Sequence, residues 1–182
     1  MPYITATDDT ELANAGFRAI AYDRRGFGRS DQPWDGYDYD TLADDLACVI
    51  EQCDAEDAAI VGFSMGGGEV ARYLSKHGAD NVSQAVLISS VVPYMLKTVD
   101  NPAGVDQSVF DEMTAGMTDD RAAFMQTFAK GFFGVGFLTS SVSDGVLDGF
   151  FQSAMMAGIH PTLACAEAFA TTDFRRDMTA FT

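Results

Sequence analysis

Basic residues, histidines and cysteines are all scarce in this sequence. In 182 residues, 11 Lys and Arg stand against 27 Asp and Glu, giving a formal net charge of −16 and a pI near 4.1. A surface of this sign repels phosphate groups, so nucleic acid and anionic membranes are excluded as partners. Apolar residues make up 47% of the chain, but no apolar run approaches the roughly 18 residues of a membrane span. We therefore expect no contact with a membrane.

The three cysteines, Cys48, Cys53 and Cys165, are odd in number and lack C-x-x-C spacing. The chain start has no basic residues followed by an apolar stretch, as a signal peptide would have. We expect reduced thiols and a cytoplasmic protein. The two histidines and these cysteines form no cluster with metal-ligand spacing. Neither a metal nor a cofactor is expected.

The order of apolar runs predicts an α/β fold. After a turn at Thr7–Thr10, strands and helices alternate, with Thr41 and Asp44 marking the start of the first helix. The predicted strands cover residues 2–6, 17–23, 58–61 and 84–89, and the helices 41–53 and 65–77. This alternation favours a mostly parallel sheet with helices on both faces.

After Pro93 the pattern changes to helices rich in Phe and Met, predicted over 106–133, 144–159 and 162–170. A run of helices after strands indicates a helical cap over one edge of the sheet. We therefore divide the chain into a partial core (1–92), a cap region (93–172) and the start of a return to the core (173–182).

Ser64 is the main candidate for chemistry. It lies in Gly62-Phe63-Ser64-Met65-Gly66, directly between a predicted strand and a predicted helix. In that context G-x-S-x-G indicates a nucleophile elbow, a sharp turn that strains the serine backbone and exposes its hydroxyl at a helix N-terminus. Three consecutive glycines, 66–68, cost about 1 kcal/mol each against alanine in a helix, which implies close backbone contact there. The alternative is a tight turn whose serine only caps the helix.

Two nucleotide-binding motifs fit less well. The interval from Gly62 to Gly67 suits a phosphate loop, but Gly68-Glu69 stands where Lys-Ser/Thr is needed. Gly26-Phe27-Gly28 has Asp31 in place of the third glycine of a dinucleotide fingerprint.

Ser64 has few potential partners. His77 lies thirteen residues further along the same helix, about 20 Å away, and is interpreted as a favourable cation at that helix end. His160 precedes Pro161 in a cap turn, and such a histidine either reaches the site or is solvated. Asp23 is placed where an orienting acid would sit, although Arg24, Arg25 and Arg29 favour ion pairs and loop hydrogen bonds for it.

Several segments together resemble one family. They include Asp23-Arg24-Arg25-Gly26-Phe27-Gly28-Arg29-Ser30 within 16–30, and the segments 39–46, 62–73, 91–98 and 171–178. The chain resembles the α/β-hydrolase superfamily over nearly its whole length, in the branch of cofactor-free haloperoxidases, perhydrolases and aryl esterases.

This resemblance implies that Ser64 is the nucleophile and that the Met65 backbone N–H is one oxyanion donor. The implied reaction is ping-pong acyl transfer: a small ester or carboxylic acid acylates Ser64, and water or hydrogen peroxide then takes the acyl group. Peracid made in this way oxidises halide without metal or haem.

The sequence also departs from that family. A His-Gly-x-Pro type loop and its strand are missing before residues 17–23, and the strands that bring the acid and the histidine are missing after residue 178. No catalytic acid or base is identifiable, and His160 is the remaining candidate base. The alternative function is therefore a truncated, catalytically silent fragment or a binding module.

The missing strand would lie between the strands ending at Asp23 and Gly62. Unpaired backbone groups at these edges cost roughly 1–3 kcal/mol each if they are dry. We therefore expect direct re-pairing of these strands, self-association or poor folding.

Overall fold

Two parallel strands lie at the centre of the molecule. The computed structural model describes residues 6–136 and 142–181. Strand β1 (Ala58–Phe63) pairs in parallel with β2 (Val82–Ile88), and helix α3 (Met65–His77) connects them. The predicted strand–helix–strand unit and its parallel sheet are thereby confirmed.

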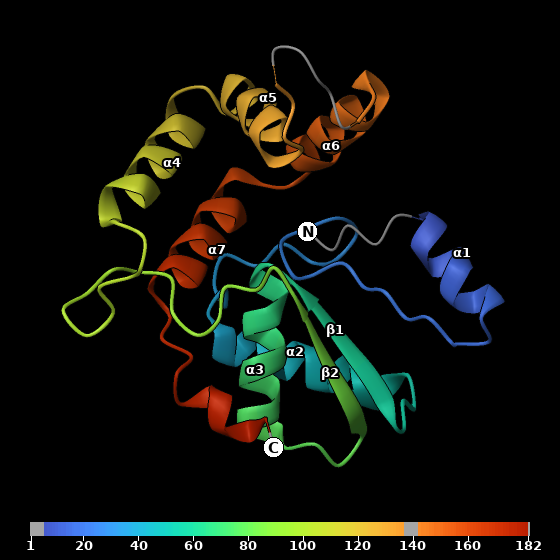
Figure 1. Cartoon of the computed structure of the whole chain (residues 1–182). Helices are drawn as coiled ribbons and strands as arrows, with labels where there is room; N and C mark the ends of the chain where they lie inside the picture. The colour runs from blue at the N-terminus through green and yellow to red at the C-terminus, as the bar shows by residue number, and fades with distance from the viewer. Residues whose placement is uncertain (1–5, 137–141, 182) are drawn as a thin grey trace.

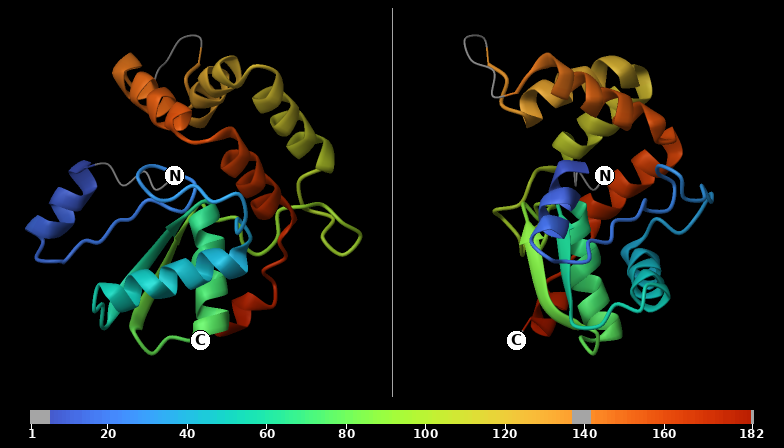
Figure 2. Two further views of the ribbon diagram at one scale, coloured as in Figure 1. Left: turned by 180° about the vertical axis from the view of Figure 1, so that it is seen from behind. Right: turned by 90° about the vertical axis from the view of Figure 1, so that its right-hand side faces the viewer.

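Helices cover one face of this sheet. Helix α2 (Tyr39–Gln52) and α3 lie on the same side of β1 and β2 (Figure 2, right). Ile60 of β1 is buried there in an apolar cluster with residues of both helices: Ala43, Leu46, Ile50, Val70, Tyr73 and Leu74. On the opposite face, Val61 and Val86 are exposed. Within the described residues, this second face is contacted at its carboxyl end, where Phe132 packs on Phe63. For the exposed remainder of that face, the prediction of a sheet covered on both faces is wrong.

Close contact around α3 depends on two of its three glycines. A Cβ atom at Gly67 would overlap Ser90 Oγ, and one at Gly68 would lie 2.5 Å from Phe174 Cζ. At Gly66 the nearest atom would be 3.7 Å away, so a side chain has room there. The expected close approach is confirmed at the second and third glycines only.

The N-terminal segment differs from the prediction. Residues 2–5 of the first predicted strand lie outside the described residues. Ala6 begins helix α1 (Ala6–Asn14), which stands apart from the sheet in Figure 1, so the predicted turn at Thr7–Thr10 is wrong.

Residues 17–23 are not a strand either. A strand requires a partner for its backbone groups, and within the described ranges β1 is hydrogen-bonded to β2 alone. The segment is extended and mostly exposed, and only its carboxyl end packs on the core, through Tyr22. The expected direct re-pairing of the two strands has therefore not occurred.

Helix α2 begins earlier than predicted, and Asp38 rather than Thr41 caps it. The Asp38 carboxylate accepts hydrogen bonds from the Thr41 backbone N–H at 3.0 Å and from the Thr41 hydroxyl at 2.8 Å. Aspartate competes well for this role because its two oxygens can serve both donors.

The single helix predicted over 106–133 is two helices, α4 (Gln107–Asp119) and α5 (Arg121–Phe132). Asp120 separates them, and its carboxylate accepts the Ala123 backbone N–H at 3.0 Å, which caps α5. Two further helices follow, α6 (Asp144–Met156) and α7 (Ile159–Thr171). Helix α6 ends before its predicted last residue, 159, and α7 starts before its predicted first residue, 162.

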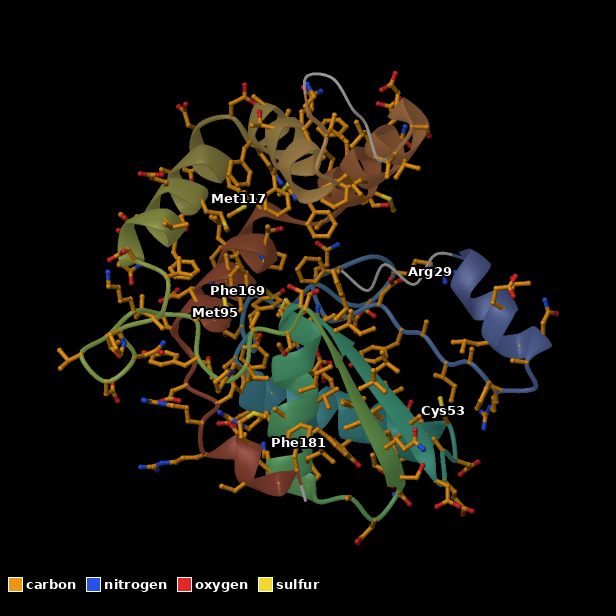
Figure 3. All side chains as sticks on the ribbon, viewed as in Figure 1. Arg29, Cys53, Met95, Met117, Phe169 and Phe181 are labelled. Carbon is orange, nitrogen blue, oxygen red and sulfur yellow. The ribbon has the colours of Figure 1, made fainter. Side chains whose placement is uncertain are left out.

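Helices α4 to α7 gather beyond the carboxyl ends of β1 and β2 (Figures 1 and 2). They share an apolar cluster built from Met117, Met125, Ala129, Phe150, Ala154 and Ala166. Phe169 of α7 packs against this cluster and also, near Met95, against the core that contains Tyr39 and Phe174 (Figure 3). Helix α7 thus links the four helices to the sheet layer. No helix in the described ranges is long and apolar enough to cross a membrane.

A short 3₁₀ helix, Asp177–Ala180, returns to α3 near the end of the chain. Arg72 of α3 donates from Nε to Asp177 Oδ1 at 3.0 Å and from Nη1 to Asp40 Oδ1 at 2.5 Å. Asp177 is buried, so this arginine joins three separate segments.

Substituting Gly68 tests the close packing of α3. We expect Gly68→Ala to lower the free energy of unfolding by about 1–3 kcal/mol, because the new methyl group must displace Phe174 and Tyr39. Gly149→Ala is the matched control: it lies in α6, where an added methyl group would have no other atom within 4 Å, and it should gain about 0.5–1 kcal/mol. Urea unfolding of both variants measures this, and equal effects would contradict the packing argument.

Candidate active site

Ser64 adopts a left-handed backbone conformation at the junction of β1 and α3, with φ 52° and ψ −119°. Few residues other than glycine take positive φ, because the Cβ atom crowds the backbone. Gly62 makes the turn possible, since a Cβ atom there would overlap the Gly66 carbonyl oxygen. The predicted sharp, strained turn is present, and the required space is at Gly62.

Three backbone hydrogen bonds hold this turn. The Ser64 N–H donates to the Ile88 carbonyl at 2.9 Å, and the Ser64 carbonyl accepts from Gly67 at 3.0 Å and from Val91 at 3.2 Å. The end of β2 and the loop after it therefore fix the serine backbone.

The Ser64 hydroxyl is not used as a cap. Ser64 is the N-cap of α3, but its side chain makes no capping hydrogen bond. The side chain is half-buried and has no hydrogen-bond partner among the described residues. The alternative of a serine that serves only to cap the helix does not describe this geometry.

The neighbouring Met65 amide is a free donor at the helix start. It is the first residue of α3, and its N–H makes no backbone hydrogen bond within the described residues. Such groups, together with the helix dipole, favour negative charge nearby. The Tyr39 hydroxyl donates to the Met65 carbonyl at 3.1 Å and helps to hold α3 at its first turn.

A buried charge pair lies beneath the elbow. Arg24 donates to Glu69 Oε2 from Nε at 2.9 Å and from Nη2 at 2.6 Å, and the Tyr22 hydroxyl donates to Glu69 Oε1. Burial alone lowers the pKa of Arg24, but the Glu69 carboxylate outweighs this and the net pKa is raised. Burial, and then Glu69, raise the pKa of Tyr22. Tyr22 and Arg24 thus keep the protons that they donate to Glu69, and these hydrogen bonds hold residues 22–24 on α3.

The sequence-based prediction paired Arg24 with Asp23 and missed Glu69. A signal for Glu69 was present: Met65, Glu69 and Tyr73 are spaced four residues apart, and all three are buried. A charge at the middle position of such a face requires a buried partner.

Asp23 closes the following loop. Its carboxylate accepts the Arg29 backbone N–H at 3.0 Å, and its carbonyl accepts the Ser30 hydroxyl at 2.5 Å. The predicted loop hydrogen bonds are confirmed, and so is an ion pair with Arg29, whose Nε lies 3.9 Å from Asp23 Oδ2. Arg25 pairs with Asp45 instead. Asp23 is therefore a structural residue of this loop.

Both histidines have partners other than Ser64. His160 stacks on Trp34 with ring centroids 3.9 Å apart, and its Nε2 lies 2.7 Å from the Trp34 carbonyl oxygen. His77 ends α3, as predicted, and its Nε2 lies 2.8 Å from Asp44 Oδ1. Neither histidine ring is held by its hydrogen bonds in a position to act as a base for Ser64.

Aromatic side chains of α5 reach the turn at Ser64. Phe63, immediately before Ser64, packs edge-on against Phe132 of α5 at 6.3 Å. Phe128 and Phe132 remain partly exposed. A hollow of about 210 Å³ between α5 and α6 is lined by other residues, among them Lys130 and Asp148. The described residues contain no group of three or more His, Cys, Asp or Glu side chains that could hold a metal ion.

The fold and this turn are those of an α/β hydrolase, and comparison with known proteins agrees. Residues 9–129 match the alpha/beta hydrolase fold family, so the chain belongs to that family. It is 42% identical over 160 residues (87% of this chain, 58% of that protein) to the bifunctional esterase/perhydrolase of Acinetobacter calcoaceticus. A bromoperoxidase structure from Bacillus anthracis superimposes with a TM-score of 0.91 at 44% identity, covering 95% of this chain and 63% of that one.

The chain spans about 60% of the length of the first curated relatives it matches. A non-heme haloperoxidase of Rhodococcus erythropolis is 35% identical over 212 residues, covering 99% of this chain and 77% of that protein. Because 212 exceeds the 182 residues of this chain, part of the matched stretch in that relative has no counterpart here.

The buried pair predicts a large difference between two acidic variants. Glu69→Ala leaves the Arg24 charge buried and alone, and we expect it to cost about 3–5 kcal/mol of unfolding free energy. Asp45→Ala breaks the partly exposed pair with Arg25 and should cost about 1 kcal/mol or less. Denaturant titration compares them, and a small loss for both would contradict the role given to Glu69.

Cys165 of α7 should be an unreactive thiol. Burial raises its pKa from 9.0 to about 11, so it stays protonated where a free thiol ionises. Alkylation near pH 8.5 should label the exposed Cys48 first and spare Cys165. The Cys165 thiol ionises at lower pH in the unfolded chain than in the folded one. Its contribution to the free energy of unfolding is therefore complete below pH 9 and declines as the pH rises towards 11. Rapid labelling of Cys165 in the folded chain would contradict its burial.

Proposed function

We propose that this chain is a serine hydrolase of the esterase/perhydrolase type, with Ser64 as its nucleophile. The observation that carries the proposal is the left-handed Ser64 at the start of α3, with φ 52° and a hydroxyl unused by the helix. A strained serine at this point costs about 1–3 kcal/mol, and such strain clusters at active sites. Relatives named esterase/perhydrolase and haloperoxidase support the same chemistry.

In the proposed first step, Ser64 Oγ attacks the carbonyl carbon of a small ester. The Oγ–C bond forms, the C–O bond to the alcohol breaks, and the hydroxyl proton goes to the departing alcohol oxygen. The Met65 N–H is the proposed donor to the negative oxygen that develops, aided by the N-terminus of α3.

In the second step, water attacks the acyl carbon, the Oγ–C bond breaks and a proton returns to Oγ. The product is a carboxylic acid, or a peracid when hydrogen peroxide replaces water. The partly exposed Phe128 and Phe132 beside Phe63 support a small apolar or aryl acyl group. We propose no cofactor, nucleic acid or membrane for this reaction.

The placement of the histidines supports slow turnover in this chain. His77 is bound to Asp44 and His160 to the Trp34 carbonyl, so neither is assigned as the base. In subtilisin, losing the triad histidine costs about 10⁶ in kcat. This observation favours the second candidate function, a catalytically silent α/β-hydrolase fragment or binding module.

Two other features follow from the same proposal. We assign residues 93–172 as a cap over Ser64, which agrees with the contact of Phe132 on Phe63. The three cysteines are free, which supports a reducing, cytoplasmic site of action.

A covalent-labelling experiment separates the nucleophile from turnover. A fluorophosphonate should modify Ser64, located by mass spectrometry, and Ser64→Ala should abolish that adduct. Hydrolysis of p-nitrophenyl acetate should stay near background, and His160→Gln should leave it unchanged.

Each part of the proposal can fail separately. Labelling at another residue would exclude Ser64 as the nucleophile. Serine-dependent turnover well above background would exclude the silent alternative, and its loss in His160→Gln would identify the base.

A further inference from the structure

The Tyr39 hydroxyl is hydrogen-bonded to the residue that directly follows Ser64. Tyr39 is the first residue of α2 and is 1% exposed, and its hydroxyl donates to the Met65 carbonyl at 3.1 Å. Burial raises the pKa of Tyr39, so the phenol keeps the proton that it donates. A carbonyl oxygen has two lone pairs, and a helix uses one of them, so this bond adds to those of α3.

The first turn of α3 is weak on its own. Gly66, Gly67 and Gly68 follow Met65, and glycine is the least favourable helix residue after proline. The Met65 N–H, the proposed oxyanion donor, lies in this turn. A donor of this kind is effective only when its direction is fixed before the reaction. The contacts that fix it must therefore come from outside the helix.

Two peptide groups meet at the Met65 Cα atom, and each is held from outside α3. The first joins Ser64 to Met65 and carries the Met65 N–H, and its carbonyl oxygen accepts the Val91 N–H at 3.2 Å. The second joins Met65 to Gly66, and its carbonyl oxygen accepts the Tyr39 hydroxyl. Because a peptide group is planar, fixing both groups leaves little rotation at Met65, and its N–H keeps one direction.

The Tyr39 ring is in turn fixed by close packing. It stands edge-on to Phe174, with ring centroids 4.6 Å apart and an interplanar angle of 87°. A Cβ atom at Gly68 would lie 2.7 Å from Tyr39 Cε1, so a glycine is needed here for the ring to reach the first turn. Phe174 is fully buried, and its N–H donates to the Pro93 carbonyl at 2.8 Å. The position of the hydroxyl therefore depends on three segments that are distant in sequence.

We propose that Tyr39 is a positioning residue for the oxyanion donor of this site. Its hydroxyl fixes the Met65 carbonyl and thereby the direction in which the Met65 N–H meets the negative oxygen that develops on the substrate. The inference rests on the proposed function of Ser64. Tyr39 acts through Met65 alone, because its burial keeps it out of contact with a substrate.

Removing the hydroxyl while keeping the ring tests this role. In Tyr39→Phe we expect the rate constant for reaction of Ser64 with a fluorophosphonate, kinact, to fall about 10-fold, less than the 10²–10³ lost with an oxyanion donor itself. The reagent's binding constant, KI, should stay unchanged, because the negative charge develops only during the reaction.

Tyr37→Phe is the matched control. Tyr37 is also buried, at 5% exposure, and its hydroxyl also donates to a backbone carbonyl, that of Pro33 at 2.6 Å. This variant should leave kinact and KI unchanged. Urea unfolding of both variants should show a similar loss of stability, so that a slower reaction in Tyr39→Phe alone cannot come from general destabilisation.

Hydrogen exchange of the Gly67 amide, followed by NMR, gives a second readout. This N–H closes the first turn of α3 on the Ser64 carbonyl at 3.0 Å. We expect it to exchange about 5-fold faster in Tyr39→Phe than in the parent chain, because the turn opens more often without the hydroxyl. The same amide should be unaffected in Tyr37→Phe.

The outcomes separate this role from the proposed function. Labelling of Ser64 at equal rates in Tyr39→Phe and the parent chain would overturn the positioning role, even if Gly67 exchange became faster. An equal fall of kinact in Tyr37→Phe, a change confined to KI, or unchanged Gly67 exchange would also overturn it. Failure of the parent chain to be labelled at Ser64 would instead remove the proposed function, and with it the donor that Tyr39 is to position.

Discussion

Close packing of α3 is the constraint on which the rest of the structure depends. Its inner side is formed by Gly67, Gly68 and the buried Glu69, which bring Ser90, Phe174 and Arg24 within contact distance. Larger residues at the two glycines would push α3 away from the loop after β2 and from the C-terminal segment. Because Ser64 directly precedes this helix, such a displacement would also move the serine.

Only a small part of the fold holds Ser64 in its backbone conformation. Its backbone is held by Ile88 and Val91, and its conformation is made possible by Gly62. All these residues belong to β1, β2 and their immediate surroundings. A histidine and an acid would have to come from elsewhere, and the described histidines are held by Asp44 and Trp34. The geometry of Ser64 is therefore local, whereas the activation proposed for its hydroxyl would depend on distant elements.

The parts of the fold that could be predicted from sequence are those whose ends are marked by neighbouring residues such as glycines. The predicted bounds of the helix Met65–His77 agree with those found, because glycines and a strand frame its start and Gly78 follows its end. The segment 17–23 has an apolar composition typical of a strand, but strand formation depends on a neighbour that composition does not reveal. Asp120 divides a predicted helix because its capping oxygen outweighs a continuous apolar pattern.

In the candidate site, too, the local features could be predicted from sequence and the contacts between distant residues could not. Ser64, its strained turn and the adjacent Met65 amide follow from five consecutive residues. The pairing of Arg24 with Glu69 spans 45 residues, and only the buried position of Glu69 on its helix face indicates it. The Trp34 partner of His160 is 126 residues away, and no pattern in the sequence predicts it.

That last contact gives the molecule a natural optical probe. Trp34 is the only tryptophan in the chain, and its indole lies parallel to the His160 imidazole, with an interplanar angle of 6°. The tryptophan emission of this protein therefore comes from one place alone, where the loop before α2 meets the start of α7.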